Sequence, residues 1–125
     1  MSVSSRLEHA FQDAPVLPLT YRSRYVLMSD CHRGIGTSSD NFLKNQHLFI
    51  AALKYYYRKG FTYIELGDGD ELWENRNMKN IIEVHDDIFE MFAQLHRQNR
   101  LYLIYGNHDI IKKKKNNLFP YPFYE

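Results

Sequence analysis

Hydrophobic and polar positions follow one another along the chain in a pattern that predicts three strands separated by two helices. Three short apolar runs predict buried strands, at 25–28, 62–66 and 101–105. Between the first two runs, apolar residues recur at helical spacing over 40–58, and Gly60 is placed to end that helix. Between the last two runs, a longer apolar stripe predicts a second helix over 77–99.

This order of elements predicts an α/β fold with a parallel βαβαβ core, right-handed crossovers and helices on the sheet faces. Buried parallel strands of this kind need cover on both sides. Residues 1–24 contain Pro15 and Pro18, lack sustained periodicity, and predict an N-terminal extension that partly packs on the domain. The domain itself spans 25–111, and 112–125 is a basic and aromatic tail typical of a segment cut from a larger domain.

Composition narrows the class of protein. A chain of 125 residues with 44% hydrophobic and 25% charged residues is ordinary for one soluble domain. Its net charge of +1 does not indicate nucleic acid or an anionic membrane as a partner. No apolar stretch approaches the roughly 20 residues that span a bilayer, and the first residues lack a signal pattern. Cys31 is the single cysteine, which excludes an internal disulfide and fits a reducing, cytoplasmic setting.

Three polar segments each follow a predicted strand, at 29–32 (Ser-Asp-Cys-His), 67–71 (Gly-Asp-Gly-Asp-Glu) and 106–109 (Gly-Asn-His-Asp). Because the carboxyl ends of parallel strands share one edge of a sheet, we expect these segments to meet in one crevice. Each segment carries groups that bind metals. The sequence therefore predicts a metal site at this edge.

Two divalent ions about 3.5–4 Å apart promote phosphoester hydrolysis by generating a hydroxide and neutralising charge on the phosphoryl oxygens. Such a pair of ions needs a bridging carboxylate. Asp68 is the natural bridge, with Asp30 and His32 on one ion and Asn107 on the other. Oxygen donors mixed with imidazole nitrogen suit manganese, iron, cobalt or zinc. In an extended segment, Asp30 and His32 face the same side while Cys31 faces the other, so we expect Cys31 to be a small buried residue and not a ligand.

Asp30 and Asp68 each also have an interpretation that needs no metal, if each is considered without the other segments. Aspartate is a common helix cap and turn former, and either role would explain Asp30 or Asp68 without a metal. The occurrence of all three segments in order, each after a strand, favours the metal site.

These segments resemble the first three signature blocks of the calcineurin-like metallophosphoesterase superfamily. The matching motifs are Asp30-x-His32, Gly67-Asp68-x-x-Glu71 and Gly106-Asn107-His108-Asp109. The resemblance covers roughly 24–110 and implies the first half of a metallophosphoesterase α/β sandwich. It also implies a dinuclear metal centre that hydrolyses phosphomonoesters, phosphodiesters or pyrophosphates, with Asp30, His32 and Asp68 at one metal and Asp68 and Asn107 at the other.

The resemblance also implies roles beyond metal binding. His108 would meet the leaving oxygen or the phosphoryl oxygens, Asp109 would orient it, and Asn107 would share in substrate binding. Glu71 would stabilise the loop, or would contact a metal ligand without binding the metal itself. Arg33 could bind a substrate phosphate through its planar fork, and a solvent-exposed arginine is an equal alternative.

The sequence departs from the family pattern after His108. The family completes its site with a lone histidine and a Gly-His-x-His block, and neither occurs in these 125 residues. The segment 71–75 (Glu-Leu-Trp-Glu-Asn) is closer to the bacterial branch that includes UDP-diacylglucosamine pyrophosphatases than to eukaryotic-type protein phosphatases. We therefore expect this chain alone to hold one ion weakly or none, and to have little or no activity. The alternative is a non-catalytic module that binds metal or assembles, and we expect a homo-oligomer formed through an uncovered sheet edge or the tail.

Overall fold

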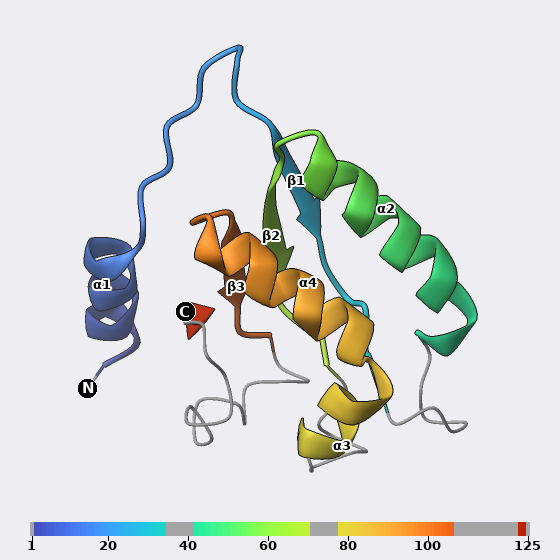
Figure 1. Cartoon of the computed structure of the whole chain (residues 1–125). Helices are drawn as coiled ribbons and strands as arrows, with labels where there is room; N and C mark the ends of the chain where they lie inside the picture. Colours follow the sequence, from blue (N-terminus) through green and yellow to red (C-terminus); the bar gives the residue numbers. More distant parts are fainter. Residues whose placement is uncertain (1, 35–41, 71–77, 107–122, 125) are drawn as a thin grey trace.

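The structure of the chain is a computed structural model that describes residues 2–34, 42–70, 78–106 and 123–124 (Figure 1). The elements follow in this order: α1 (Val3–Asp13), β1 (Tyr25–Met28), the short 3-10 helix η1 (Leu43–Asn45), α2 (Gln46–Arg58), β2 (Thr62–Leu66), α3 (Met78–Val84), α4 (Asp86–Arg97), β3 (Leu101–Ile104) and β4 (Phe123–Tyr124).

The four strands form one parallel sheet in the spatial order β1-β2-β3-β4. Met28 at the end of β1 pairs with Glu65, and Leu66 at the end of β2 pairs with Ile104. The carboxyl ends of β1, β2 and β3 therefore lie at one edge of the sheet, as the sequence predicts. The predicted fold class, α/β with a parallel βαβαβ core, is confirmed.

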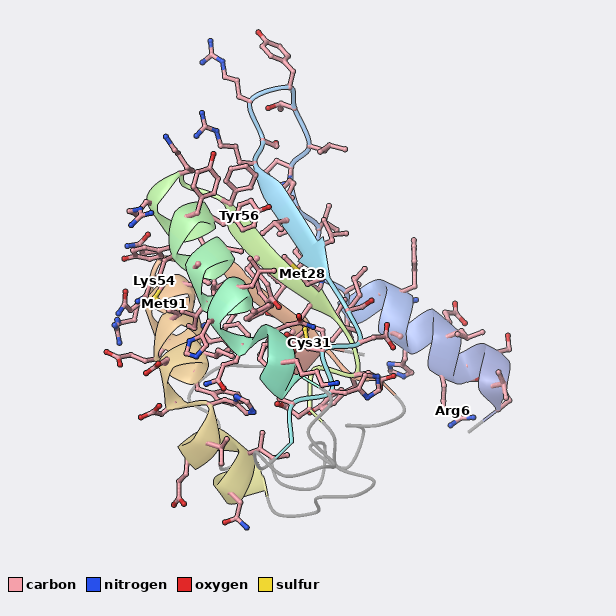
Figure 2. The ribbon with its side chains drawn as sticks, turned by 90° about the vertical axis from the view of Figure 1, so that its right-hand side faces the viewer. Arg6, Met28, Cys31, Lys54, Tyr56 and Met91 are labelled. Carbon is pink, nitrogen blue, oxygen red and sulfur yellow. The ribbon has the colours of Figure 1, made fainter. Side chains whose placement is uncertain are left out.

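Helices α2 and α4 lie on the same face of this sheet (Figures 1 and 2). Right-handed crossovers between strands placed in the order β1-β2-β3 put successive helices on one side, which explains the shared face. The core forms between them and the inward strand residues, and its most buried members include Leu53, Tyr63, Ile88, Phe92 and Leu103. The sequence predicts helices on the sheet faces. In the structure, α2 and α4 both lie on one face.

Apolar side chains also point to the opposite face of the sheet. Leu27 in β1 is 55% exposed and Leu66 in β2 is 48% exposed. Further along, the rings of Tyr102 and Tyr124 lie 5.8 Å apart. This face therefore exposes apolar side chains to solvent. A parallel sheet that is covered on both faces would bury them.

The second predicted helix is two helices, α3 and α4, separated at His85. No glycine or proline marks this break in the sequence. His85 leaves the helical conformation (φ −114°, ψ 38°) and packs its buried ring edge-on against Phe42, 5.5 Å away. Asp86 and Asp87 then occupy the first turn of α4, where carboxylates interact favourably with the helix dipole.

The N-terminal extension contains a helix, α1, which was not predicted from the sequence. Ser2 caps α1 by accepting a hydrogen bond from the Ser5 backbone N–H (3.1 Å). All α1 side chains stay at least partly exposed, and α1 lies on the opposite side of the sheet from α2 and α4 (Figure 2). Contact with the domain comes from the following segment, where the Tyr25 hydroxyl donates to the Pro18 carbonyl.

Two residues of the predicted tail join the sheet of their own chain, as Phe123 and Tyr124 pair with Leu103 and Ile104. The rest of the tail, 112–122 and 125, lies outside the described residues. Among the described residues, none of the helices is both long and apolar enough to cross a membrane.

Candidate metal centre

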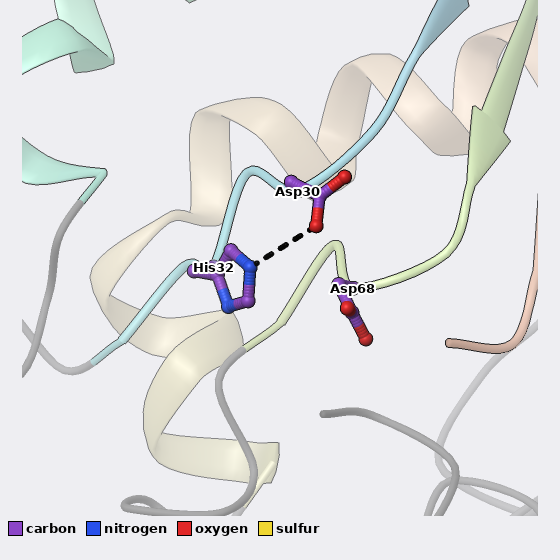
Figure 3. Close-up of side chains that lie close together, drawn as sticks. All are labelled: Asp30, His32 and Asp68. Carbon is purple, nitrogen blue, oxygen red and sulfur yellow. Dashed lines mark ion pairs between the residues drawn. The ribbon is translucent and has the colours of Figure 1, made fainter. Parts of the chain in front are cut away.

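Asp30, His32 and Asp68 come together where β1 and β2 end (Figure 3). Asp30 and His32 lie in the loop after β1, and Asp68 lies in the loop after β2. Backbone hydrogen bonds hold the two loops side by side: Asp30 N–H donates to Gly67 O (3.2 Å) and His32 N–H donates to Asp68 O (2.9 Å). The pairing of β1 with β2 thus continues into the loops that carry the three side chains.

All three residues have left-handed backbone conformations, with φ of 56° at Asp30, 52° at His32 and 51° at Asp68. Such conformations cost a non-glycine residue about 1–3 kcal/mol and concentrate at functional sites. The expectation of an extended Asp30–His32 segment is therefore wrong, although the two side chains still meet. The two side chains meet because the backbone turns at these residues, and not because alternate side chains of a strand face the same side.

The donor atoms of the three side chains all lie within 4.8 Å of one another. His32 Nε2 lies 3.5 Å from Asp30 Oδ1. Donors bound to one ion at about 2.0–2.2 Å lie roughly 3–4 Å apart, so this arrangement fits a single divalent ion with little movement. The side chain of His32 is 20% exposed and that of Asp30 is 66% exposed, so the cluster is open to solvent from the Asp30 side.

Two glycines allow the backbone to approach this cluster closely. Gly67 has φ +91°, and a Cβ there would lie 2.9 Å from the Cα of Gly106. A Cβ on Gly106 would overlap Asp68 Oδ1 and the Asp68 backbone nitrogen. Gly106 follows β3, so the loops after β2 and β3 touch at Asp68. The first residue of the third polar segment is therefore in contact with the second segment.

The Arg33 side chain points into the protein. Both expectations for this residue, phosphate binding and exposure to solvent, are therefore wrong. Its side chain is 0% exposed, so it neither contacts a substrate phosphate nor lies on the surface. Its guanidinium donates to both Glu65 carboxylate oxygens (3.0 and 2.8 Å), and its Nε donates to Asp70 Oδ1 (2.8 Å). The ring faces of Phe89 and Phe92 lie 5.4 and 5.3 Å from its central carbon.

This cluster of Arg33, Glu65, Asp70 and Tyr63, here called the buried ion-pair network, adjoins the candidate metal ligands. Arg33 follows His32 in the chain and Asp70 lies two residues after Asp68, and their backbones form a parallel bridge. The Tyr63 hydroxyl donates to Glu65 Oε2 (2.7 Å). The network therefore ties the His32 loop to the Asp68 loop at a second point.

Burial and charge shift the pKa values in this network. Burial opposes the charge on Arg33, but the neighbouring Asp70 and Glu65 carboxylates outweigh it and raise the pKa of Arg33 well above its usual range. Burial, with the Glu65 carboxylate adding to it, raises the pKa of the Tyr63 hydroxyl well above its usual value. The network is therefore a fixed arrangement of one cation, two carboxylates and one neutral phenol.

Cys31 lies between two candidate ligands without belonging to the described metal cluster. It is partly buried, and it packs against the core. Burial raises the pKa of its thiol to about 11, which disfavours the thiolate that binds metals.

The remaining predicted site residues lie outside the described part of the chain: Glu71, Asn107, His108 and Asp109. Of the predicted metal ligands, the structure thus brings together Asp30, His32 and Asp68. Comparisons of the chain with protein-family models, with curated proteins and with solved structures return no match.

Sequence reasoning missed the buried ion-pair network, although the sequence contains a signal for it. Glu65 and Tyr63 occupy alternate positions of a buried strand, and Leu103 on the paired strand is an inward residue. A carboxylate at an inward position of a buried strand needs a cation close by. Arg33 is the basic residue nearest to the metal-ligand motif, and its place in the chain makes it the natural partner.

Proposed function

We propose that this chain carries the metal-binding part of a phosphoester hydrolase. The observation that supports this most strongly is the convergence of Asp30, His32 and Asp68 at the carboxyl edge of the sheet, with donor atoms within 4.8 Å. These residues are the ones that the resemblance to calcineurin-like metallophosphoesterases assigns to one metal. Backbone strain of this kind concentrates at functional sites, and here it occurs at all three residues of the cluster, which is consistent with a ligand-holding role.

The proposal extends to a second ion through Asn107. Gly106, the residue before Asn107, contacts Asp68, the residue proposed to bridge the two ions. Manganese, iron, cobalt and zinc all suit the oxygen and imidazole donors. When bound, such ions neutralise charge on the phosphoryl oxygens and help water to attack the phosphorus.

The chain's own residues would supply binding and proton transfer. Asp30, His32 and Asp68 would hold the ion, and through it they would fix where the phosphate lies relative to the sheet edge. His108 would donate the proton that the leaving oxygen needs, and Asp109 would orient the imidazole and favour its protonated form. Arg33, buried next to the ligands, would hold the loops in place without touching the phosphate.

Turnover and metal content together test this proposal. We expect little hydrolysis of 4-nitrophenyl phosphate by this chain alone, and we expect whatever rate is measured to depend on added Mn²⁺. We expect His108→Ala to leave metal content unchanged and to lower the rate about 10²–10⁴-fold, the usual contribution of general acid catalysis. Loss of metal together with activity would make His108 a ligand. Absence of both metal binding and turnover in the unmodified chain would contradict the proposal.

A non-catalytic metal-binding module is the second candidate. It is favoured by the described cluster, in which three side chains are enough to hold one ion without any group placed to transfer a proton. Stoichiometric metal binding without hydrolysis of 4-nitrophenyl phosphate would support this candidate over the enzyme.

A further inference from the structure

A pocket of about 420 Å³ opens beside the metal cluster, between the end of β1 and the beginning of α2. Its volume falls within the range of about 300–1,000 Å³ that is typical of small-molecule sites. Asp30 and His32 line both the pocket and the metal cluster. A molecule whose phosphate reaches the cluster would therefore have its remaining part beside or inside this pocket.

The walls of the pocket are mostly apolar. Beyond the two metal ligands, the lining is dominated by five side chains: Met28, Phe42, Leu48, Phe49 and Ala52. Asp30 is the one carboxylate among the described residues that line it, and it lies at the side shared with the metal cluster. Ser29 and Asn45 also line the pocket and offer two polar side chains. A sugar has more hydroxyls than these can satisfy, so part of its hydrogen bonding to water would be lost without replacement, which is costly.

Two features of these walls suit a flat ring. The rings of Phe42 and Phe49 meet edge to face, with centroids 5.0 Å apart and planes 81° apart, and both belong to the buried core, so they form a rigid aromatic floor to the pocket. Met28 lies at the end of β1, and its unbranched thioether adapts to the shape of a ring beside it. Leu48 is 73% exposed and forms the outer part of the wall.

We propose that this pocket holds the aromatic group of an aryl phosphate ester whose phosphate lies at the Asp30–His32–Asp68 cluster. The inference rests on the proposed function and names the substrate class for the same site. The cluster binds the phosphate, and the pocket selects esters of aromatic alcohols over esters of sugars or short alcohols.

Binding of 1-naphthyl phosphate, inorganic phosphate and 1-naphthol, each measured by calorimetry with Mn²⁺ present, tests this. The chain offers a matched pair of variants on one helix: Ala52 lines the pocket, whereas Ala51 is exposed and does not. We expect the unmodified chain and Ala51→Leu to bind 1-naphthyl phosphate about tenfold or more tightly than inorganic phosphate. We expect Ala52→Leu, which fills the pocket, to lose this margin while its affinity for inorganic phosphate stays unchanged.

Leu48→Asn provides a second variant, since Leu48 is largely exposed and its replacement does not threaten the core. It should also reduce the margin. Equal affinities for 1-naphthyl phosphate and inorganic phosphate in the unmodified chain would overturn the pocket proposal, as would a margin that survives in Ala52→Leu.

The 1-naphthol measurement separates this proposal from the proposed function, because it needs neither metal nor phosphate. Binding of 1-naphthol that is lost in Ala52→Leu and kept in Ala51→Leu supports the pocket even if Mn²⁺ does not bind, and in that case the metal function alone fails. Failure of 1-naphthol to bind the unmodified chain would overturn the pocket while leaving the metal centre in place.

Discussion

Arg33 is the residue on which the geometry of the metal centre depends most. Its guanidinium holds Glu65 and Asp70 in a fully buried setting, and its backbone pairs with the loop that carries Asp68. The planar fork of arginine matches this arrangement, with two bonds to one carboxylate and a third to another. A lysine could supply the charge but not these directions.

Arg33→Met should lower the free energy of unfolding by about 3–5 kcal/mol, because it leaves two buried carboxylates without their cation. Arg33→Lys should recover part of the loss. The exposed Arg97→Met serves as the control and should change stability by less than about 0.5 kcal/mol. Urea denaturation followed by circular dichroism gives these values, and an Arg33→Met variant as stable as Arg97→Met would refute the structural role.

Tyr63 should make stability depend on high pH. Its pKa is raised in the folded chain, so its contribution is complete below the unfolded pKa of about 10 and is lost as the pH rises through the folded pKa. Tyr63→Phe should be less stable than the unmodified chain at pH 8, by about 1.5–3 kcal/mol, because Glu65 loses a hydrogen bond. The difference between the two proteins should shrink above about pH 10.

The control is Tyr21→Phe at a 95% exposed position, where the difference from the unmodified chain should stay close to zero at both pH values. Denaturation curves at pH 8 and above pH 10 decide the matter. A Tyr63→Phe difference that grows with pH would give the opposite sign and contradict the placement of the phenol.

At the scale of elements, the site depends on how closely the loops after β2 and β3 approach. Gly106→Ala would place a methyl group on Asp68 and push this ligand out of position. We expect Mn²⁺ affinity to fall about 10–100-fold, the range seen when groups that orient a ligand are disturbed. Calorimetric titration measures it.

Gly60→Ala is the matched control. Gly60 also needs its glycine, with φ +80°, but a Cβ there meets nothing within 4 Å, and Gly60 lies at the opposite end of β2 from Asp68. It should cost about 1 kcal/mol of stability and leave Mn²⁺ affinity unchanged. Equal effects of the two substitutions on metal binding would argue against contact between the loops.

The elements also show which parts of the fold the sequence predicts well. The strands have strong apolar patterns and clear boundaries, so β1 and β2 match their predicted ranges and β3 ends one residue earlier. The break at His85 could not be predicted, because no glycine or proline marks it and the ring that His85 packs against, that of Phe42, is far away in the sequence. Helix α1 was missed although Val3, Leu7 and Phe11 recur every four residues behind the capping Ser2, a short pattern that indicates a helix.

The same contrast applies to the candidate site. Asp30, His32 and Asp68 could be predicted to meet, because strand order fixes where the loops after parallel strands lie. Their left-handed backbones could not, because these depend on how two loops pack against each other. Local spacing suggested an extended segment, and tertiary contact overrode it. The burial of Arg33 was missed, although the inward-facing carboxylate of Glu65 is a sequence signal for a buried cation.

At the scale of the whole molecule, the sheet face opposite α2 and α4 gives a reason for self-association. Leu27 and Leu66 are exposed on this face. The other expected interface was the tail, but two of its residues, Phe123 and Tyr124, pair with β3 of their own chain. Exposed apolar surface on a sheet recruits a partner. We therefore predict a homodimer at micromolar concentration that Leu27→Asp dissociates.

Light scattering after size exclusion measures this association. Leu48→Asp is the control, since Leu48 on α2 is 73% exposed, more than Leu27, and lies on the other side of the sheet. A monodisperse species of 15.0 kDa for the unmodified chain would contradict the prediction. Dissociation by both variants alike would show that the open face is not the interface.

Metal binding at Asp68 tests the central claim most directly. Calorimetric titration with Mn²⁺ compares the unmodified chain, Asp68→Asn and the control Asp13→Asn, in which the replaced carboxylate is 84% exposed on α1. Asparagine tolerates the left-handed backbone of Asp68, so the first variant should fold while losing a charged ligand. We predict saturable binding near one equivalent in the unmodified chain and in Asp13→Asn, and a loss greater than about 100-fold in Asp68→Asn. Equal Mn²⁺ affinity in all three proteins, or no saturable binding in any of them, would contradict the metal centre.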